Sequence, residues 1–268
     1  AYNDELMIII EQNDGQLISK RLIDFTTMQL IQLVQLENEK FVGALTESSI
    51  IIWSLLINQL HIEYIEHNIH KQKINSICSL SDNRIVSCSN VQIIIVLNGE
   101  PPYEIIIQID LSLYHLKQCK VLKQINENYI ISSLYDSTIC VWDLRIYQLV
   151  TVVENKTDNS KQDYFYAFDD KRLIMQKDNS DITVVFNTST WEIIDEIKFS
   201  GHLLSVEKIN ADAIFCQLDS LYFSVYDIKR KELTRSSIAF FYQTIGLIRL
   251  NEYTYATPNK VGITAFTF

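Results

Sequence analysis

The chain has 268 residues, and its 23 Lys and Arg against 33 Asp and Glu give a formal net charge of −10. This acidic balance disfavours binding to the phosphate backbone of nucleic acids, because that affinity comes from clustered Lys and Arg, and it disfavours docking on anionic membranes. No apolar run reaches the roughly 18 residues that a membrane-spanning helix requires. We therefore expect a globular protein that neither binds nucleic acid nor inserts into a membrane.

The five cysteines each lie within an apolar stretch, and no two of them form a CxxC pair; they stand at positions 78, 88, 119, 140 and 216. An odd and scattered set of this kind is typical of buried thiols in a reducing compartment rather than of disulfides or a zinc site. The cysteines thus predict a cytoplasmic location and no structural metal.

The predicted elements are all strands, and they recur along the chain. The apolar run 7–10 comes first, and Leu17 opens a second strand. An apolar residue, a polar turn and an apolar pair then recur at 36–42, 80–86 and 125–131, with weaker copies that start at Phe168, Ile209 and Leu250. Each copy predicts a β-hairpin. The copies start 41 to 45 residues apart, which indicates one structural unit repeated along the chain.

A run of β-branched residues follows each hairpin and ends on a large apolar residue, here called the anchor. The anchors are spaced 40 to 46 residues apart, at Ile10, Trp53, Val96, Trp142, Phe186, Tyr226 and Phe266. Seven residues past most anchors a further apolar residue opens another strand, as at Leu17, Leu60, Leu149, Ile193 and Leu233. Each unit therefore contains four short strands, called a, b, c and d in chain order.

These runs are β-branched and too short for helices. One four-stranded sheet cannot bury both of its faces, whereas sheets stacked face to face can, and closure into a ring removes the exposed end faces. Strand-rich repeats of this length are typical of propellers. We therefore predict an all-β fold, a β-propeller of four-stranded blades.

Residues 136–145 (DSTICVWDLR) resemble a WD40 repeat, and the preceding Ile131-Ser132-Ser133 resembles the small-residue strand b of that family. The resemblance implies a hydrogen-bonded structural set with a Ser or Thr on strand b, an Asp in the b–c turn, the Trp of strand c and a His in the d–a loop. In this chain Ser132, Asp136, Trp142 and His115 would fill those places. Elsewhere the resemblance rests on repeat spacing, with partial matches at Trp53-Ser54, His70, Gly201-His202 and Tyr226-Asp227.

The strand pattern also predicts a number of blades. The chain supplies c and d of a first unit, five complete units, and a, b and c of a last one. In WD40 propellers the outer strand of the last blade usually comes from the N-terminus, so the missing strands would precede Ala1. We expect a single domain over residues 1–268 with seven blades, belonging to a longer protein with roughly 30 to 40 further N-terminal residues. The alternative is six blades, closed by a strand over 17–22.

A metal site is one candidate for chemistry, because three histidines and two glutamates lie close together in the sequence, at His61, His67, His70, Glu63 and Glu66. No helix arranges them as ligands, and they fall across strand d and a d–a loop. A solvated loop with one structural histidine, His70, fits this pattern better than a metal site.

Ser132, Asp136 and His115 could imitate a hydrolase triad, but the WD40 resemblance assigns them to the structural set. The carboxylates lie mainly in turns, and no pair is singled out for glycosidase chemistry in a central channel. Six glycines in the whole chain leave no Gly-rich phosphate loop. We therefore predict no catalytic residue, no metal and no cofactor. A propeller hydrolase is the least favoured alternative.

Binding is the remaining class of function, and several turns carry candidate contact residues: Tyr103 in the loop 98–103, the polar loop 155–163, Trp191, and the basic cluster of Lys229, Arg230 and Lys231. The alternative for each is a solvated turn, or for Trp191 packing against a neighbouring strand. Arg145 completes a Trp-Asp-x-Arg pattern that resembles the one in WD40 substrate receptors of cullin ubiquitin ligases.

We expect a non-enzymatic protein–protein interaction scaffold, a subunit of a larger complex in the cytoplasm or on the cytoskeleton, with other proteins or peptides as partners. Two alternatives stay open. The chain could be the regulatory or targeting propeller of a larger enzyme, or the substrate receptor of a cullin-type ubiquitin ligase.

Overall fold

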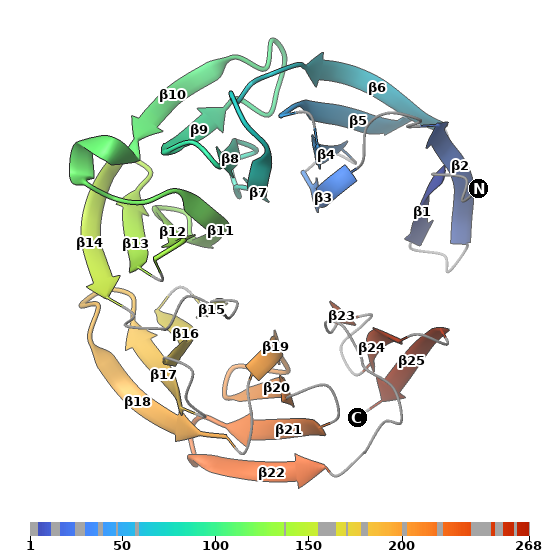
Figure 1. Cartoon of the computed structure of the whole chain (residues 1–268). Coiled ribbons are helices and arrows are strands. Elements are labelled where there is room, and N and C mark those ends of the chain that lie inside the picture. Colours follow the sequence, from blue (N-terminus) through green and yellow to red (C-terminus); the bar gives the residue numbers. More distant parts are fainter. Residues whose placement is uncertain are drawn as a thin grey trace. The chain divides into compact units, whose positions relative to one another are not determined.

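The computed structural model describes most of the chain, and it divides into two compact units, residues 1–154 and 155–268. The described residues are 5–11, 17–24, 30–36, 40–46, 48–56, 59–136, 138–154, 165–169, 171–177, 182–199, 203–218, 222–236, 248–249, 254–259 and 262–267. Over these residues the structure consists of antiparallel strands and one 3₁₀ turn (Figure 1). No helix within these ranges has the length and apolar character needed to cross a bilayer.

The first unit contains one two-stranded sheet and three four-stranded sheets. The two-stranded sheet pairs β1 (Glu5–Glu11) with β2 (Leu17–Asp24). The four-stranded sheets are formed by β3 (Leu30–Gln35), β4 (Lys40–Leu45), β5 (Ile50–Leu56) and β6 (Gln59–Glu66); by β7 (Ile74–Ser79), β8 (Ile85–Ser89), β9 (Ile93–Leu97) and β10 (Ile105–Asp110); and by β11 (Cys119–Asn126), β12 (Tyr129–Leu134), β13 (Thr138–Asp143) and β14 (Gln148–Glu154). The 3₁₀ turn η1 (Leu111–Tyr114) joins β10 to β11.

The second unit contains two four-stranded sheets and one three-stranded sheet. The four-stranded sheets are formed by β15 (Phe165–Asp169), β16 (Arg172–Lys177), β17 (Ile182–Asn187) and β18 (Ile193–Lys198), and by β19 (Leu203–Lys208), β20 (Ala213–Leu218), β21 (Tyr222–Asp227) and β22 (Glu232–Ser236). The last sheet pairs β23 (Ile248–Arg249), β24 (Thr254–Asn259) and β25 (Gly262–Thr267).

This strand order confirms the all-β prediction and the repeat of four strands. Each predicted hairpin forms an a–b pair, and each predicted β-branched run forms a strand c, which is an inner strand in the five four-stranded sheets. The incomplete sheets at the two ends also match the strand pattern, with c and d first and a, b and c last. The count of seven blades and the single domain over 1–268 stay predictions.

Neighbouring four-stranded sheets in each unit share apolar cores, which is why the repeat is stable. Even-numbered residues of β4 and β5, such as Val42 and Ile52, pack with Ile85, Ile95 and Leu97 of the next sheet. The other face of that sheet packs against β12 and β13, around Trp142. In the second unit a similar core lies between the β15–β18 and β19–β22 sheets. Because strand c is covered on both faces, its side chains need not alternate between apolar and polar.

The strand register corrects one predicted anchor. Trp142 pairs with Ile130, the second residue of β12. In the β7–β10 sheet the corresponding pair is Ile85 with Leu97, whereas Val96 pairs with Val86 and faces the opposite core. The anchor of this unit is therefore Leu97 and not Val96. The correction makes the spacing between anchors more even, with 44 residues from Trp53 to Leu97 and 45 from Leu97 to Trp142.

The a strands form one edge of each sheet, and side chains of the preceding sheet bind some of their free N–H groups. The amide of Ile77 on β7 donates to Gln32 Oε1 on β3 at 2.9 Å. The amide of Leu122 on β11 donates to Ser76 Oγ on β7 at 3.2 Å. In the second unit the amide of Lys208 donates to the Tyr166 hydroxyl at 3.0 Å. These bonds satisfy edge groups that would otherwise be exposed, and they join successive sheets.

All five cysteines are free thiols, and four of them are fully buried. Cys88, Cys119 and Cys140 lie in the core between the β7–β10 and β11–β14 sheets. Burial raises the pKa of Cys78 to about 11 and that of Cys140 to about 12, so these thiols are held in their neutral form. The prediction of buried cysteines is confirmed for four of the five, and Cys78 is half-buried.

Candidate interaction sites

The structure brings together two of the four residues expected in the WD40-type set. The Trp142 indole Nε1 donates a hydrogen bond to Ser132 Oγ at 2.8 Å, and both residues are completely buried. Asp136 lies in the exposed turn after β12, where its Oδ1 accepts the amide of Thr138 at 3.1 Å. His115 is exposed and caps the C-terminus of η1 in a left-handed conformation. The aromatic ring that packs on Trp142 belongs to Tyr114, at 5.6 Å between centroids and 79° between planes.

His70 forms the bond that was expected of His115, but one sheet earlier. Its Nε2 lies 2.9 Å from Ser87 Oγ, and both residues are buried. Ser87 has the register of Ser132, since each lies two residues after the strand-b partner of the anchor. Burial lowers the pKa of His70 to about 4, so the imidazole is neutral. The sequence signal that would have aligned His70 with this set is its spacing of 17 residues from Ser87, which equals the spacing of His115 from Ser132.

The β3–β6 sheet has the anchor tryptophan without the serine. Gly43 occupies the register of Ser132, and a Cβ atom there would lie 2.7 Å from Cη2 of Trp53. Glycine therefore leaves room for the Trp53 ring to approach strand b. Within the described residues the Trp53 Nε1 has no hydrogen-bond partner. The residue types of the WD40-type set are thus distributed over three sheets. Of these three, only the β11–β14 sheet has both the serine and the tryptophan.

Tyr103 is not an exposed contact, because its side chain is 95% buried between two sheets. Its hydroxyl donates to Glu63 on β6, and Lys40 Nζ lies 2.7 Å from Glu100 and 3.4 Å from Glu63. The Tyr103 ring also packs against Tyr64 at 4.9 Å. Burial, and then the bond to Glu63, raises the pKa of Tyr103 to about 12. This network joins the β9–β10 loop to the preceding sheet.

A comparable network joins the next two sheets. Arg84, at the entry to β8, donates to the Tyr147 hydroxyl at 2.7 Å and to the Leu144 carbonyl at 3.3 Å. Asp82 pairs with the same guanidinium at 2.6 Å. Lys40 and Arg84 both directly precede the strand-b partner of the anchor. The repeat therefore places a basic residue where it reaches the c–d turn of the following sheet.

The remaining candidate contacts lie in c–d turns, and most of them have intramolecular partners. Arg145 pairs with Asp143 at 2.5 Å, and its side chain is 59% exposed. Lys231 Nζ reaches Asp195 on β18 at 2.8 Å, and Arg230 lies 3.9 Å from Asp227. Lys229 is exposed in the same turn. Trp191 is half-buried, with a left-handed backbone that closes the β17–β18 turn. The loop 155–163 lies outside the described residues.

Four of the five residues considered as metal ligands bind separate partners. His67 Nδ1 lies 3.5 Å from Ser49 Oγ, His70 bonds to Ser87, and Glu66 accepts the Tyr64 hydroxyl. Glu63 belongs to the Tyr103 network and His61 is exposed on β6. Over the described residues no group of three His, Cys, Asp or Glu is arranged to hold a metal ion.

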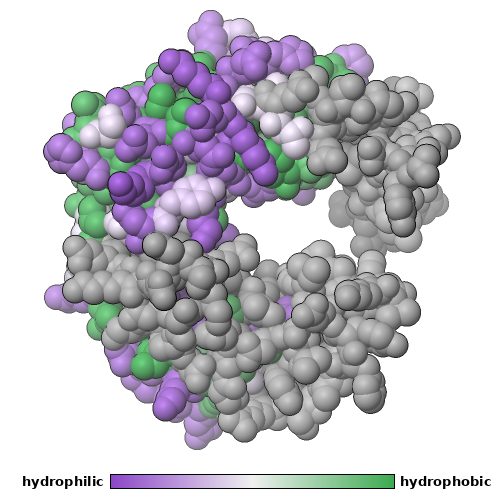
Figure 2. Space-filling view, viewed as in Figure 1, coloured by the Kyte–Doolittle hydropathy of each residue, from purple (hydrophilic) through white to green (hydrophobic). Residues whose placement is uncertain are grey.

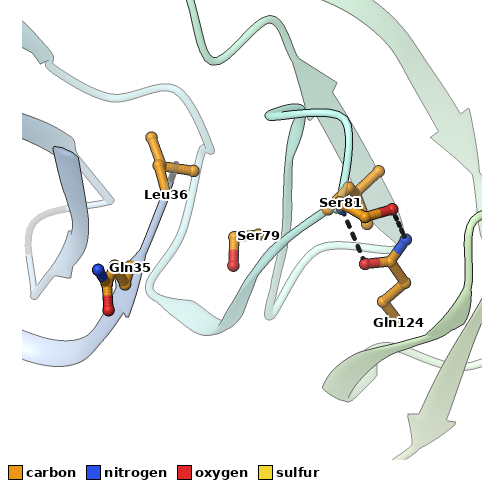
Figure 3. A pocket seen from close by; sticks show the side chains of 6 residues that line it. Gln35, Leu36, Ser79, Ser81 and Gln124 are labelled. Carbon is orange, nitrogen blue, oxygen red and sulfur yellow. Dashed lines mark hydrogen bonds between the residues drawn. The ribbon is translucent and has the colours of Figure 1, made fainter. Parts of the chain in front are cut away.

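An open pocket of about 340 Å³ lies where β3, β7 and β11 end, lined by Gln35, Leu36, Ser79, Leu80, Ser81 and Gln124 (Figure 3). Gln124 bridges to the neighbouring turn, since its Oε1 accepts the Ser81 amide at 2.9 Å and its Nε2 donates to Ser81 Oγ at 3.0 Å. The lining side chains are neutral, so the pocket offers hydrogen bonds and apolar contact but no acid, base or nucleophile of altered pKa.

The d strands form the outer edges of the four-stranded sheets and carry exposed apolar pairs. These are Ile62 and Ile65, Ile105 and Ile106, Val150 and Val152, and Ile193 and Ile194, each 39 to 50% exposed. On the face of the first unit that is turned to the viewer, hydrophilic side chains prevail and apolar ones form small groups (Figure 2). The exposed surface therefore offers the d strands at the sheet edges, and the turns between strands, as places for contact.

No family model matches the chain, and no curated protein matches it. Solved structures do. The chain is similar to one titled "Crystal Structure of Mitotic Checkpoint Complex", with a TM-score of 0.76 and 10% identity over 98% of this chain and 82% of that chain. For "Structure of U3-55K" the values are 0.69 and 12%, over 91% and 81% of the two chains. For "Crystal Structure Of The C-Terminal WD40 Domain Of Sif2" they are 0.70 and 13%, over 98% and 74%. These similarities establish the fold, which is that of a WD40 β-propeller.

Proposed function

We propose that this WD40-type propeller is a non-enzymatic scaffold for protein–protein interaction and a subunit of a larger cytoplasmic assembly. The observation that carries the proposal is that side chains suited to catalysis are used to hold the repeat together. Ser132 binds Trp142, Ser87 binds His70, and Glu63 binds Tyr103 inside or between sheets. The exposed turns and the exposed d strands are then the surfaces at which a partner can bind.

The similar structures support this proposal. One is named for a checkpoint complex, in which the similar chain is a component of an assembly. A stack of sheets joined by side-chain bonds is rigid, so its loops form preorganised contact surfaces that lose little entropy on binding. Protein or peptide partners use such surfaces through a few anchoring side chains surrounded by polar contacts.

Affinity purification from the native organism tests the proposal. The full-length protein would carry a tag, complexes would be fixed by mild cross-linking, and the ratio of co-purified proteins would be measured by mass spectrometry. We expect at least one protein in near-equal amount, absent from a control with the tag alone. Recovery of the free protein without a stoichiometric partner would contradict the scaffold. Recovery as one polypeptide with a catalytic domain would favour a regulatory propeller of an enzyme.

The cullin-receptor alternative is favoured by one observation. Asp143 and Tyr129 hold the Arg145 guanidinium at the surface with 59% of the side chain exposed. If this arginine contacts a ligase adaptor, Arg145→Glu abolishes co-purification of a cullin. Arg230→Glu is the matched control, because Arg230 is also exposed in a c–d turn and lies beside Asp227. Equal cullin recovery with both variants would remove this alternative.

A further inference from the structure

Three equivalent positions of the a strands line the open pocket of about 340 Å³ in the first unit (Figure 3). Gln35, Ser79 and Gln124 occupy one register in successive sheets. Each pairs with the residue of strand b that in turn pairs with the anchor of its sheet. The repeat therefore brings the same position of three neighbouring sheets to one pocket.

Gln124 shows which group fills this position when the repeat is complete. Its side chain reaches back to the a–b turn of the preceding sheet, where its Oε1 accepts the Ser81 amide at 2.9 Å and its Nε2 donates to Ser81 Oγ at 3.0 Å. A carboxamide is suited to this place, because it supplies one acceptor and one donor side by side. Between the β7–β10 and β11–β14 sheets the gap is thus closed by the chain's own glutamine.

One sheet earlier the same position holds a serine, whose side chain is too short to form this bridge. Within the described part of the chain, the side chains of Ser79 and Gln35 have no hydrogen-bond partner (Figure 3). Leu36 and Leu80 are buried and supply the apolar part of the lining. The space that a glutamine would fill is therefore open beside Ser79, and its volume lies within the range of about 300 to 1,000 Å³ that ligand pockets have.

The lining determines the charge of the group that fits. None of the six lining residues is charged. Asp82 and Arg84, which follow Ser81 in the chain, pair with each other at 2.6 Å. A charged group would lose its hydration here without meeting a counter-charge in the lining, which is costly. A neutral group that both donates and accepts hydrogen bonds matches Gln35 and Ser79, which also do both.

We infer that this pocket binds the side chain of a glutamine on a partner protein, by the kind of bonds that Gln124 forms within the chain. The inference rests on the proposed interaction function and names the group by which a partner is held. The aliphatic part of the glutamine packs against Leu36 and Leu80. Its carboxamide bonds to Gln35 and Ser79, whose polar groups have no other partner among the described residues.

Saturation-transfer NMR with the full-length protein tests the inference with defined probes. The main probe is glutamine capped as N-acetyl and N-methylamide, and the capped glutamate and methionine have a similar length but a charge or no carboxamide. A heptapeptide of Gly and Ser with one central glutamine represents a partner chain. The variant Ser79→Gln fills the pocket with the chain's own carboxamide, and Gln35→Leu removes a polar group from the lining. Ser189→Gln is the matched control, because Ser189 lies in an exposed turn of the second unit.

We expect capped glutamine to bind about threefold or more tightly than capped glutamate and capped methionine, since each of these loses at least one hydrogen bond. Ser79→Gln should weaken glutamine binding by about tenfold or more, Gln35→Leu by about threefold or more, and Ser189→Gln by less than about twofold. Circular dichroism should show that Ser79→Gln stays folded, as the equivalent Gln124 does in the next sheet. Gln35 is exposed, so Gln35→Leu tests the inference even if Ser79→Gln unfolds.

Equal binding of the three capped residues, or equal losses in Ser79→Gln and Ser189→Gln, would overturn the inference. A heptapeptide that binds no more tightly than capped glutamine would overturn the assignment to a partner chain, in favour of a free small amide. A native partner that Ser79→Gln still captures in full would overturn the inference while leaving the scaffold function intact. The peptide measurement needs no native partner, so a failure of the scaffold proposal is recognised separately, by affinity purification.

Discussion

Trp53, Leu97 and Trp142 occupy one register in three successive sheets, but their polar surroundings differ. Trp142 has the serine, and Trp53 has a glycine in its place. The β7–β10 sheet keeps the serine and the histidine but has leucine as the anchor. At the residue scale the fold therefore depends mainly on buried volume at the anchor. The hydrogen bonds of the WD40-type set add to stability only in the sheets that have both partners, as in the Trp142–Ser132 and His70–Ser87 pairs.

Trp142→Ala should reduce the free energy of unfolding by about 3 to 5 kcal/mol, because it removes the largest buried side chain from the core between two sheets. Trp191→Ala is the matched control, since Trp191 is only half-buried in a turn, and it should cost less than about 1.5 kcal/mol. Urea titration followed by circular dichroism measures both. A loss below about 1 kcal/mol at Trp142 would show that it is not a core anchor.

The buried histidine predicts a pH dependence of stability. The pKa of His70 is lowered to about 4 from 6.5 by burial, so between these values the unfolded chain binds more protons than the folded one. The contribution of His70 to the free energy of unfolding is therefore fully present above pH 6.5, and it is lost as the pH falls towards 4. The loss amounts to up to about 3 kcal/mol. Chemical denaturation at a series of pH values measures it.

His70→Gln removes this titration, so the variant should show a flatter stability curve between pH 4 and 6.5. His115→Gln is the control, because His115 is exposed at the end of η1. That variant should keep the slope of the wild type. If both variants change the slope equally, His70 is not the buried group that the structure shows.

The sequence indicates which residue types form the polar set, but not which copies come together. His115 lies the same number of residues before Ser132 as His70 lies before Ser87, so spacing alone cannot separate them. The difference arises in the backbone: η1 ends in a left-handed residue at His115 and places Tyr114 on Trp142 instead. Tyr103 was expected at the surface for a similar reason, because the partners that bury it, Glu63 and Lys40, are distant in sequence.

At the scale of elements, the sheets are joined by side chains as well as by apolar cores. Basic residues at the entry to strand b reach the next c–d turn, and polar side chains bind amides on the next strand a. The bonds from basic residues join neighbouring sheets near their c–d turns. The bonds to backbone amides join them along the a strands. Figure 1 shows this division within the first unit, where the a strands converge and the d strands lie outermost.

The Arg84–Tyr147 bond can be measured with a double-mutant cycle. Arg84→Met and Tyr147→Phe should each destabilise the protein, with a coupling energy of about 1 kcal/mol, because the bond spans two sheets and is partly buried. The comparison pair is Arg145 and Tyr129, which contact within one sheet at 3.3 Å and are more exposed. Its coupling should be smaller. If the coupling energy of Arg145 and Tyr129 were larger than that of Arg84 and Tyr147, the Arg84–Tyr147 bond would not be an important connection between the sheets.

The positions of the strands could be predicted because β-branched runs and polar turns repeat along the chain. The register within a run could not always be predicted. In β9 the five residues Ile93–Leu97 are all apolar, so either face could be assigned to either core, and only the pairing of Ile85 with Leu97 decides. The charged turns are ambiguous in another way, since Lys231 looks solvated in sequence but reaches Asp195 on β18.

At the scale of the whole molecule, the repeat uses Ser132, Ser87 and His70 inside its sheets and leaves the d strands exposed at the sheet edges. The apolar pairs on the d strands are then a surface with binding energy to offer. These pairs recur on β6, β10, β14 and β18. A scaffold whose contact surface recurs from sheet to sheet can hold more than one partner at a time, which is the role that we propose for this chain.

Sedimentation of the endogenous protein in a gradient of native lysate tests the central claim most directly. The account predicts that the protein migrates well above the mass of its own polypeptide at physiological salt, and that high salt releases part of it. Migration as a free monomer under all conditions would contradict a scaffold that works within a larger assembly.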